Sequence, residues 1–413
     1  MKTDFSSAKE NKMILIISAV FPPEPVVSAR LSLDIADNLS QTNRVTVLSP
    51  KPTRPYGFHF EEKSVGHHPF VHIVANSYIC PELKFIGRLR ESYSFGKYCQ
   101  KFICENKNKI SAIYANTWPL FGQFFAVKAA KKHHIPIIIH VQDIYPESLF
   151  NKIPYFKKIL TAFLLPIDKY ILKQAAHIIA ISGNMKLHLA QTRNINQQKI
   201  TVINNWQDES LFVHYRNSKT VKQSDTRFTF MYLGNIGPVA GVDLLINAFC
   251  QIQPVQNTRL VIAGSGSMKD SLQQKCEKLK IENIEFWSVP DGKVPEIQDY
   301  ADVLLLPIKK GAAHSSIPSK LPAYMFSAKP IIACVDDESD TANSIGSANC
   351  GWIVPPENVS MLSTKLQEVI NLPKSELVQK GENGRNYALR NLSKKENLNK
   401  LVSIIRESNA NTN

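Results

Sequence analysis

The sequence predicts an α/β protein built from two doubly wound, Rossmann-like domains. Three observations predict this fold: the length of 413 residues, the alternation of short apolar segments with helical patterns, and a polar segment near the middle of the chain. Chains of this length usually form two or three domains, each with its own core. With 44% hydrophobic and 20% charged residues, the composition excludes disordered, collagen-like and disulfide-stapled proteins.

Thirteen short apolar segments are predicted to be strands, and several are apolar on both faces, as in a parallel sheet covered by helices. The first-half strands are Met13–Ser18, Arg44–Ser49, Phe70–Ala75, Ala112–Ala115, Ile135–His140, His177–Ser182 and Ile200–Asn204. The second-half strands are Phe228–Leu233, Arg259–Ala263, Ile284–Ser288, Val303–Pro307, Ile331–Val335 and Trp352–Val354. Between them, Asn205–Asp225 is polar and aperiodic and is predicted to be a linker. We therefore expect domains over residues 12–205 and 226–395, and a C-terminal helix or tail over residues 396–413.

The net charge of +14 lies almost entirely in the first half, where residues 1–200 hold 26 Lys and Arg against 13 Asp and Glu. Such an excess is typical of proteins that contact nucleic acid or an anionic membrane. The seven cysteines include no Cys-x-x-Cys pair, which indicates buried free thiols in a reducing cytoplasm. The polar first twelve residues do not resemble a signal peptide, and no apolar run reaches about 18 residues, so we expect no membrane span.

Ionisable side chains follow two predicted strands of the N-terminal domain, at the strand ends where doubly wound sheets bind ligands. After the first strand, the loop FPPEPVVSAR carries Glu24 and Arg30, which either reach toward a cleft or lie in a solvated loop. After the fifth strand, the segment HVQDIYPES carries His140 and Asp143. We interpret it as an acid/base or hydroxyl-binding site; the alternative is that the two side chains cap the strand and a turn.

In the C-terminal domain, two glycine-bearing loops follow successive strands, GNIGPVAGVD at residues 234–243 and GSGS at residues 264–267. Backbone N–H groups of such loops can approach phosphate oxygens, although glycine also simply permits tight turns. A further segment, KKGAAHSSIPSK at residues 309–320, places Ser319 where it would cap the next helix and Lys320 in the first turn. A cation in the first turn is repelled by the positive end of the helix dipole. Either a bound diphosphate compensates for this repulsion, or Lys320 is an exposed lysine that tolerates it without a ligand.

These motifs resemble, as a set and in this order, the sugar-nucleotide-dependent glycosyltransferases of family 4, which have the GT-B fold. The motifs are FPPEP, DIYPES, GNIGPVAGVDLLINAF, VIAGSGS and SIPSKLPAYMFSAKPII, and the resemblance covers about residues 12–400. Within the family, the sequence resembles the WbuB-like L-fucosaminyl transferases of capsule and O-antigen synthesis. The resemblance implies two Rossmann-like domains facing a cleft, with the C-terminal helix packing back on the N-terminal domain.

The resemblance also implies the reaction and its residues. It implies a retaining transfer without metal or cofactor, from a nucleotide-sugar that we expect to be UDP-linked and to carry an N-acetylated deoxyaminosugar. The donor-binding set would be Gly234, Asn235, Gly264, Ser316, Ser319 and Lys320. Asp143 and Glu24 would face the reacting sugar or the acceptor hydroxyl, and His140 joins them as a catalytic candidate.

The sequence departs from the family pattern in the donor site. Asn235 and Ala240 stand where members commonly carry Arg and Lys, and Ser315 and Ala323 stand where members carry a pair of glutamates. Glu338 is either a substitute contact to the donor hydroxyls or part of a solvated acidic turn. Because of these departures, two possibilities stay open: weakened catalysis and an unusual donor.

Two stretches, about residues 84–102 and 153–173, mix Lys and Arg with aromatic and aliphatic residues, as helices at a membrane interface do. The alternative is that they are amphipathic core helices with solvated lysines. We expect Arg30, Lys157 and Lys158 to contact the membrane or a lipid-linked saccharide acceptor. The protein would then be cytoplasmic and peripheral on the inner leaflet of the inner membrane, in capsule, O-antigen or exopolysaccharide synthesis.

Three other functions remain open at this point. A GT-B sugar-nucleotide epimerase would need acid/base carboxylates and no acceptor. A catalytically silent scaffold subunit would explain the missing glutamates. A nucleic-acid binder fits the basic composition, but the sequence has no helix-turn-helix, zinc-ligand or aromatic RNA-binding pattern.

Overall fold

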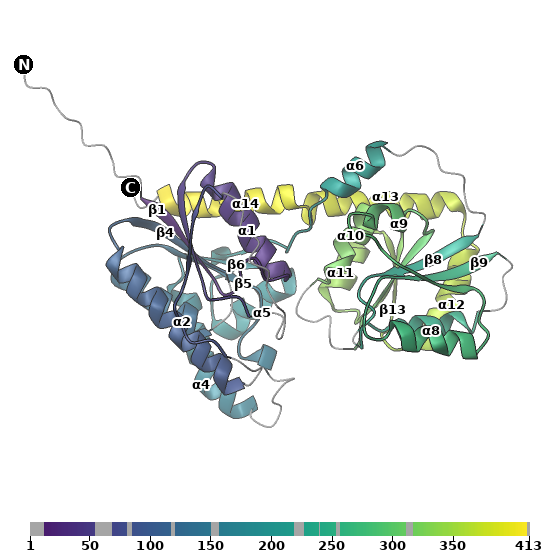
Figure 1. Cartoon of the computed structure of the whole chain (residues 1–413), viewed down its shortest axis with the longest axis horizontal. Coiled ribbons are helices and arrows are strands. Elements are labelled where there is room, and N and C mark those ends of the chain that lie inside the picture. Colours follow the sequence, from purple (N-terminus) through teal and green to yellow (C-terminus); the bar gives the residue numbers. More distant parts are fainter. Residues whose placement is uncertain are drawn as a thin grey trace, which may run out of the picture. The chain divides into compact units, whose positions relative to one another are not determined.

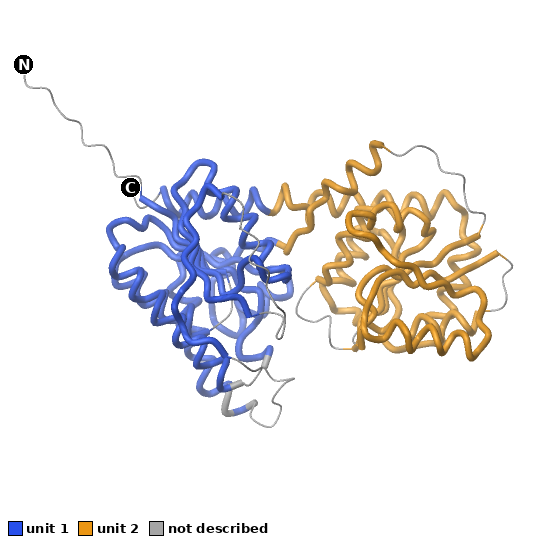
Figure 2. Tube along the Cα trace, viewed as in Figure 1, with its two compact units in different colours: residues 1–203, 398–413 blue, residues 204–397 orange. Residues whose placement is uncertain are grey.

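The computed structural model divides into two compact units, shown in different colours in Figure 2. Unit 1 comprises residues 1–203 and 398–413, and unit 2 comprises residues 204–397. The structure describes residues 12–53, 68–80, 85–116, 120–149, 157–218, 227–238, 240–252, 257–310 and 317–410. The first unit therefore ends close to the predicted boundary at residue 205, and the end of the chain returns to it.

Unit 1 is built on a parallel sheet of seven strands in the order β3-β2-β1-β4-β5-β6-β7. The strands are β1 (Met13–Ser18), β2 (Arg44–Ser49), β3 (Val71–Val74), β4 (Ile110–Asn116), β5 (Ile137–Val141), β6 (His177–Ala180) and β7 (Ile200–Val202). All seven were predicted. Strand order reverses between β1 and β4, which makes this point the topological switch of the sheet.

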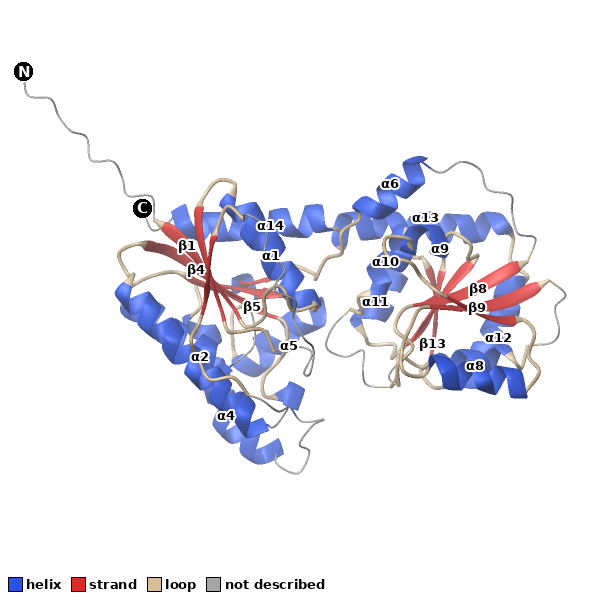
Figure 3. Ribbon diagram, viewed as in Figure 1, coloured by secondary structure: helices blue, strands red, loops and turns tan. Residues whose placement is uncertain are grey.

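Helices cover both faces of this sheet (Figures 1 and 3). They are α1 (Val27–Ser40), α2 (Phe85–Glu105), α3 (Leu120–Lys132), α4 (Lys157–Gln174), α5 (Gly183–Arg193) and α14 (Lys394–Ala410), with 3-10 turns η1 (Glu147–Leu149) and η3 (Gln197–Lys199). Alternate side chains of β1, such as Leu15 and Ile17, pack in the core formed with α2, α3 and α4. In α14, Arg406 Nη2 donates to Thr42 Oγ1 at 2.8 Å, so the C-terminal helix packs on the N-terminal unit as predicted.

Unit 2 is built on a parallel sheet of six strands in the order β10-β9-β8-β11-β12-β13, with its switch point between β8 and β11. The strands are β8 (Phe228–Leu233), β9 (Thr258–Ala263), β10 (Ile284–Trp287), β11 (Val303–Pro307), β12 (Ile331–Cys334) and β13 (Gly351–Val354). The helices are α7 (Val242–Phe249), α8 (Lys269–Lys278), α9 (Val294–Gln298), α10 (Lys320–Phe326), α11 (Asp340–Ala348), α12 (Val359–Ile370) and α13 (Lys374–Asn391). One core cluster contains α7, α8 and α12, and the other contains α9, α10, α11 and α13, so both faces of the sheet are covered.

The predicted linker is only partly irregular, because residues Ser210–Ser218 form the helix α6. Phe212 in this helix is 6% exposed, and its ring lies 5.6 Å from that of Phe326, centroid to centroid. This aromatic contact stabilises a helix that the polar local sequence does not predict, so the prediction of an aperiodic segment was wrong here.

All seven cysteines are free, and five of them are buried, as expected; Cys250 is exposed. Across the described ranges, no helix combines the length and the apolar character that a membrane span requires.

Candidate functional site

The loops after β8 and β11 flank the switch point of unit 2, where doubly wound sheets bind ligands. The loop after β8 begins at Gly234, and the segment after β11 leads into α10 at Lys320. The predicted donor residues are therefore placed at the ligand-binding edge of the sheet by strand order alone. The contacts between them show how closely they are held.

The two glycine loops pack directly against each other. Gly234 N donates to Ala263 O at 3.0 Å, and a Cβ added to Gly264 would collide with Gly234 O. A Cβ on Gly266 would likewise collide with Ile236 O. These glycines are needed for close approach between backbones, and the approach leaves the ends of β8 and β9 free of side-chain bulk.

Lys320 reaches across the start of the first loop. Its Nζ lies 5.4 Å from the centroid of the Tyr232 ring, and its aliphatic chain packs so closely on Gly234 that a Cβ there would collide with Lys320 Cε. Burial lowers the pKa of this half-buried ammonium group. Among the described residues, no carboxylate lies within ion-pairing distance of Lys320 Nζ. A cation held this way is suited to an anionic ligand.

The other predicted donor residues differ in their exposure and in their hydrogen bonds. Asn235 is exposed and its backbone carbonyl accepts from Tyr232 Oη at 2.6 Å. Ser319 is exposed, but its side chain makes no capping hydrogen bond because its φ of −58° and ψ of −18° are already helical; the prediction that it caps α10 was wrong. Glu338 is exposed in the turn before α11, and Ser316 lies outside the described residues.

Two of the four positions that depart from the family pattern, Ala240 and Ala323, are apolar and buried in this chain. Ala240 is 7% exposed and Ala323 is 6% exposed. Next to Ala323, Tyr324 is fully buried, and its hydroxyl bonds both Leu233 N and Leu233 O at 2.9 Å. Tyr324 thus fixes the end of β8 from α10. Sequence reasoning missed this residue, because nothing local distinguishes it from other apolar helix residues.

In unit 1, the three catalytic candidates differ in burial. His140 is fully buried in β5, its Nδ1 lies 2.6 Å from Tyr114 Oη, and burial lowers its pKa to about 3. It is therefore a buried histidine that is neutral near pH 7, and an acid/base role for it stays a prediction. Glu24 is 6% exposed and accepts from Thr53 N at 2.7 Å, so it joins the loops after β1 and β2, and its predicted place beside the reacting sugar or the acceptor hydroxyl stays a prediction.

Asp143 is the exposed member of the three, and it lies two residues beyond the end of β5. A small pocket of about 20 Å³ adjoins it and is also lined by Gln142, Tyr145 and Asp168. Arg30 on α1 and Lys158 on α4 are exposed, while the Lys157 side chain lies outside the described part of the structure. Asp143 is thus the best-placed candidate to meet a substrate in unit 1.

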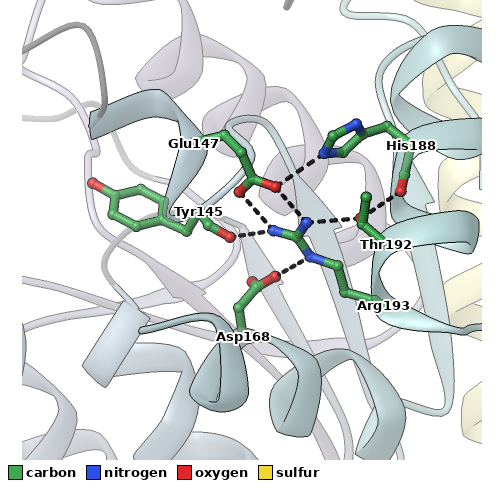
Figure 4. A network of polar contacts seen from close by, with 6 residues as sticks. All are labelled: Tyr145, Glu147, Asp168, His188, Thr192 and Arg193. Carbon is green, nitrogen blue, oxygen red and sulfur yellow. Dashed lines mark hydrogen bonds and ion pairs between the residues drawn. The ribbon is translucent and has the colours of Figure 1, made fainter. Parts of the chain in front are cut away.

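The segment after Asp143 is held by a buried ion network that sequence reasoning missed (Figure 4). The guanidinium of Arg193, at the end of α5, binds Glu147 and the carbonyl of Tyr145, and its Nε donates to Asp168 Oδ2 at 2.8 Å. His188 Nε2 lies 3.0 Å from Glu147 Oε1. The only local signal was Asp168, the single acidic residue of α4.

The two carboxylates of this network titrate differently. Burial by itself would raise the pKa of Glu147, but hydrogen bonds from Arg193 and His188 lower it to about 2. Burial raises the pKa of Asp168 to about 6, although the charge of Arg193 opposes that rise. Among the residues that the structure describes, this network included, no group of three His, Cys, Asp or Glu side chains is placed to hold a metal ion.

Comparisons with known proteins show which family models match the two halves of the chain. The model "Glycosyltransferase Family 4" matches residues 28–211, and "Glycosyl transferases group 1" matches residues 215–387. The protein is a GT-B glycosyltransferase. The two matches divide the chain close to the boundary between unit 1 and unit 2.

Individual relatives of this glycosyltransferase are distant. It is 24% identical over 282 residues to the probable glycosyltransferase WbjE of Pseudomonas aeruginosa, covering 65% of this chain and 68% of WbjE. It is 28% identical over 136 residues to the O-antigen chain mannosyltransferase RfbU of Salmonella typhimurium, covering 28% of this chain and 36% of RfbU. The structure of Anabaena Alr3699/HepE in complex with UDP matches with a TM-score of 0.69 and 16% identity, over 96% of this chain and 100% of that one.

Proposed function

We propose that this glycosyltransferase moves a sugar from a UDP-linked donor to a lipid-linked saccharide during assembly of a surface polysaccharide. The O-antigen role in the name of RfbU and the UDP held by HepE support the process and the donor nucleotide. We retain the WbuB-like resemblance, and with it an N-acetylated deoxyaminosugar, as the finer proposal. The donor binds unit 2, and Asp143 in unit 1 meets the acceptor.

The observation that carries the proposal is the position of the Lys320 ammonium group. This group lies half-buried at the switch point, beside two glycine loops and without a carboxylate partner among the described residues. A diphosphate would supply the missing charge, and the ammonium would stabilise the negative charge that grows on the diphosphate as it leaves. Lys320 thereby supplies part of the positive charge that other family members obtain from Arg and Lys at the positions of Asn235 and Ala240.

We infer a retaining reaction in which the acceptor oxygen bonds to the anomeric carbon on the face from which the diphosphate departs. The departing phosphate oxygen takes the acceptor proton, so no protein nucleophile is required. The protein's contribution is to hold both substrates and to stabilise the leaving group. Asp143 would orient the acceptor hydroxyl by accepting its hydrogen bond before the proton is transferred.

Turnover assays with a panel of UDP- and GDP-sugars, with and without a lipid-extract acceptor, test this function. Sugar transfer that requires the acceptor supports the proposal. Isomerisation of the nucleotide-sugar without acceptor supports an epimerase, and the absence of turnover with every donor supports a scaffold. Product NMR reports retention through the anomeric coupling. EDTA should leave the rate unchanged, and loss of activity that Mg²⁺ restores would overturn the metal-independent reaction.

A Lys320→Met variant tests the donor site directly. Removing a charge-assisted contact to a phosphate costs about 1.5–3 kcal/mol, so the Kd for UDP should rise about tenfold or more by calorimetry. Lys329→Met is the matched control, because Lys329 Nζ already lies 3.7 Å from Asp299 Oδ1 and should not affect UDP. Equal effects of the two substitutions would contradict the assignment.

We also propose that unit 1 contacts an anionic membrane through α2 and α4, where it would meet the lipid-linked acceptor. Ile86, Arg90, Tyr93, Lys97 and Lys101 are exposed at helical spacing along one side of α2. On α4, Lys158 is exposed and Phe163 is 72% exposed. Exposed aromatic and aliphatic residues among cations are typical of interfacial helices.

Co-sedimentation with vesicles of phosphatidylglycerol and phosphatidylcholine tests membrane contact. A variant that combines Lys97→Glu, Lys158→Glu and Phe163→Ser should lose binding, since each cation contributes about 1 kcal/mol near an anionic surface. Lys293→Glu in unit 2 is the control, because Lys293 is exposed but lies outside the proposed surface. Failure of the wild-type protein to sediment with these vesicles would overturn the membrane proposal and leave the donor assignment intact.

A further inference from the structure

We propose that Arg193 is the positioning residue that holds Asp143 in place for the transfer reaction. This inference rests on the proposed function, because it assigns a role to Asp143 in that reaction. It concerns a fully buried side chain of α5 that does not belong to the Asp143 segment and that no local sequence pattern connects to it.

Every N–H donor of the Arg193 guanidinium has an acceptor. Nε donates to Asp168 Oδ2 at 2.8 Å, and Nη1 donates to Glu147 Oε1 at 2.5 Å and to Thr192 Oγ1 at 2.8 Å. Nη2 donates to Glu147 Oε2 at 2.8 Å and to the backbone carbonyl of Tyr145. An arginine has five such donors in a rigid, planar fork, so the position and the orientation of the group are both fixed.

These contacts hold the chain immediately after Asp143. On one side, β5 ends at Val141, whose register partner is Ala180 in the neighbouring strand β6. On the other side, Arg193 binds the Tyr145 carbonyl and both oxygens of Glu147. Only three residues, Gln142 to Ile144, connect the two fixed points, and Asp143 is the middle one. A span this short follows the positions of its ends.

The surroundings of Asp143 would allow it to move if this attachment were lost. Asp143 is exposed, and the pocket of about 20 Å³ beside it lies between its segment and Asp168 of α4. A displacement of about 1 Å in a positioning group can reduce a rate about 100-fold without weakening ground-state binding. Arg193 should therefore act on kcat while leaving the donor site of unit 2 unchanged.

Arg193→Lys tests the proposal, because lysine retains the charge but has only three donors and no planar fork. We expect a fall in kcat of about tenfold or more, an unchanged KM for the nucleotide-sugar, and faster amide hydrogen exchange in residues 142–147. Added guanidinium should partly restore the kcat of Arg193→Ala. Unchanged exchange and kcat in folded Arg193→Lys, or a rise in donor KM that accounts for the whole loss, would overturn the proposal.

Arg259→Lys in unit 2 is the matched control for a buried, ion-paired arginine. Arg259 is 3% exposed and its Nη1 lies 3.3 Å from Glu285 Oε1, so its loss should lower Tm without changing exchange in residues 142–147. If circular dichroism shows that Arg193→Lys is unfolded, Glu147→Gln replaces it in the same measurements. This substitution weakens the contact between Arg193 and the segment after Asp143 but leaves Arg193 in place. If wild-type protein transfers no sugar, the proposed function fails, whereas the exchange measurement still decides whether Arg193 holds the segment.

Discussion

Lys320 and Gly234 are in direct van der Waals contact, and the contact leaves no room for a side chain on the glycine. A Cβ added to Gly234 would lie 3.0 Å from Lys320 Cδ and 3.3 Å from Lys320 Nζ, and it would collide with Cε between them. The strand β8 and the helix α10 are far apart in sequence, so this contact is what assembles the proposed diphosphate site.

Gly234→Ala should therefore displace Lys320 and weaken UDP binding. Loss of the charge-assisted contact from a displaced Lys320 costs about 1.5–3 kcal/mol, which corresponds to an increase in Kd of about tenfold or more by calorimetry. Gly237→Ala is the control in the same loop, since its nearest neighbour, Asn235 Nδ2, would lie at an ordinary 3.4 Å. UDP binding that is equally sensitive to both substitutions would contradict the contact.

The two serines that precede α10 and α11 should differ in their contribution to stability. Ser339 Oγ accepts from Ala342 N at 3.1 Å, whereas the Ser319 side chain makes no cap. We expect Ser339→Ala to lower the free energy of unfolding by about 1 kcal/mol in urea titrations. Ser319→Ala should change it by less than about 0.5 kcal/mol. The reverse order would show that Ser319 caps α10 in solution.

His140 should make stability depend on pH in the mildly acidic range. Its pKa in the folded state is about 3 because of burial, and an unfolded histidine has a pKa of about 6.5. The unfolded state therefore binds a proton first, so stability is full above about pH 6.5 and falls as the pH drops toward 3. His140→Phe should flatten this slope in thermal melts between pH 7 and 4. An unchanged slope would mean that His140 is accessible to protons in the folded protein.

The two carboxylates that bind Arg193 should respond differently to neutralisation. Glu147, with its pKa lowered to about 2, stabilises the fold above about pH 4.5, and this contribution is lost as the pH falls toward 2. Asp168, with its pKa raised to about 6, favours the fold when protonated, and that contribution is lost as the pH rises through 6. At pH 7.5, Glu147→Gln should therefore cost about 1–3 kcal/mol and Asp168→Asn should cost less, as measured by urea unfolding. A larger loss for Asp168→Asn would reverse this assignment.

Much of the fold could be predicted because strand signals are local. Segments such as Phe228–Leu233 are apolar over a short length and lie between turn-forming residues, and a chain with this pattern can bury them only in a covered parallel sheet. The glycine loops at Gly234 and Gly264 could be predicted for the same reason. Helix α6 could not, because the contact between Phe212 and Phe326 stabilises it from a distant part of the sequence.

The candidate site was predicted less completely, because exposure depends on packing that the local sequence does not encode. His140 and Asp143 are three residues apart, yet one is fully buried in β5 and the other is exposed after it. Glu24 looked equally suited to a ligand, but its carboxylate is occupied by the backbone of Thr53. A buried carboxylate must find donors, and only the folded chain shows which donors are near.

The sequence by itself determined the two doubly wound sheets and the segments that follow their strands, because hydrophobic periodicity and glycine act through neighbouring residues. The tertiary structure decided which ionisable side chains in those segments are exposed, and which distant residue holds them. Arg193 shows the difference: its partners Tyr145, Glu147 and Asp168 are separated from it by about 25 to 48 positions in the chain. Only the packing of α4, α5 and the end of β5 brings them within hydrogen-bonding distance, where a buried charge requires them.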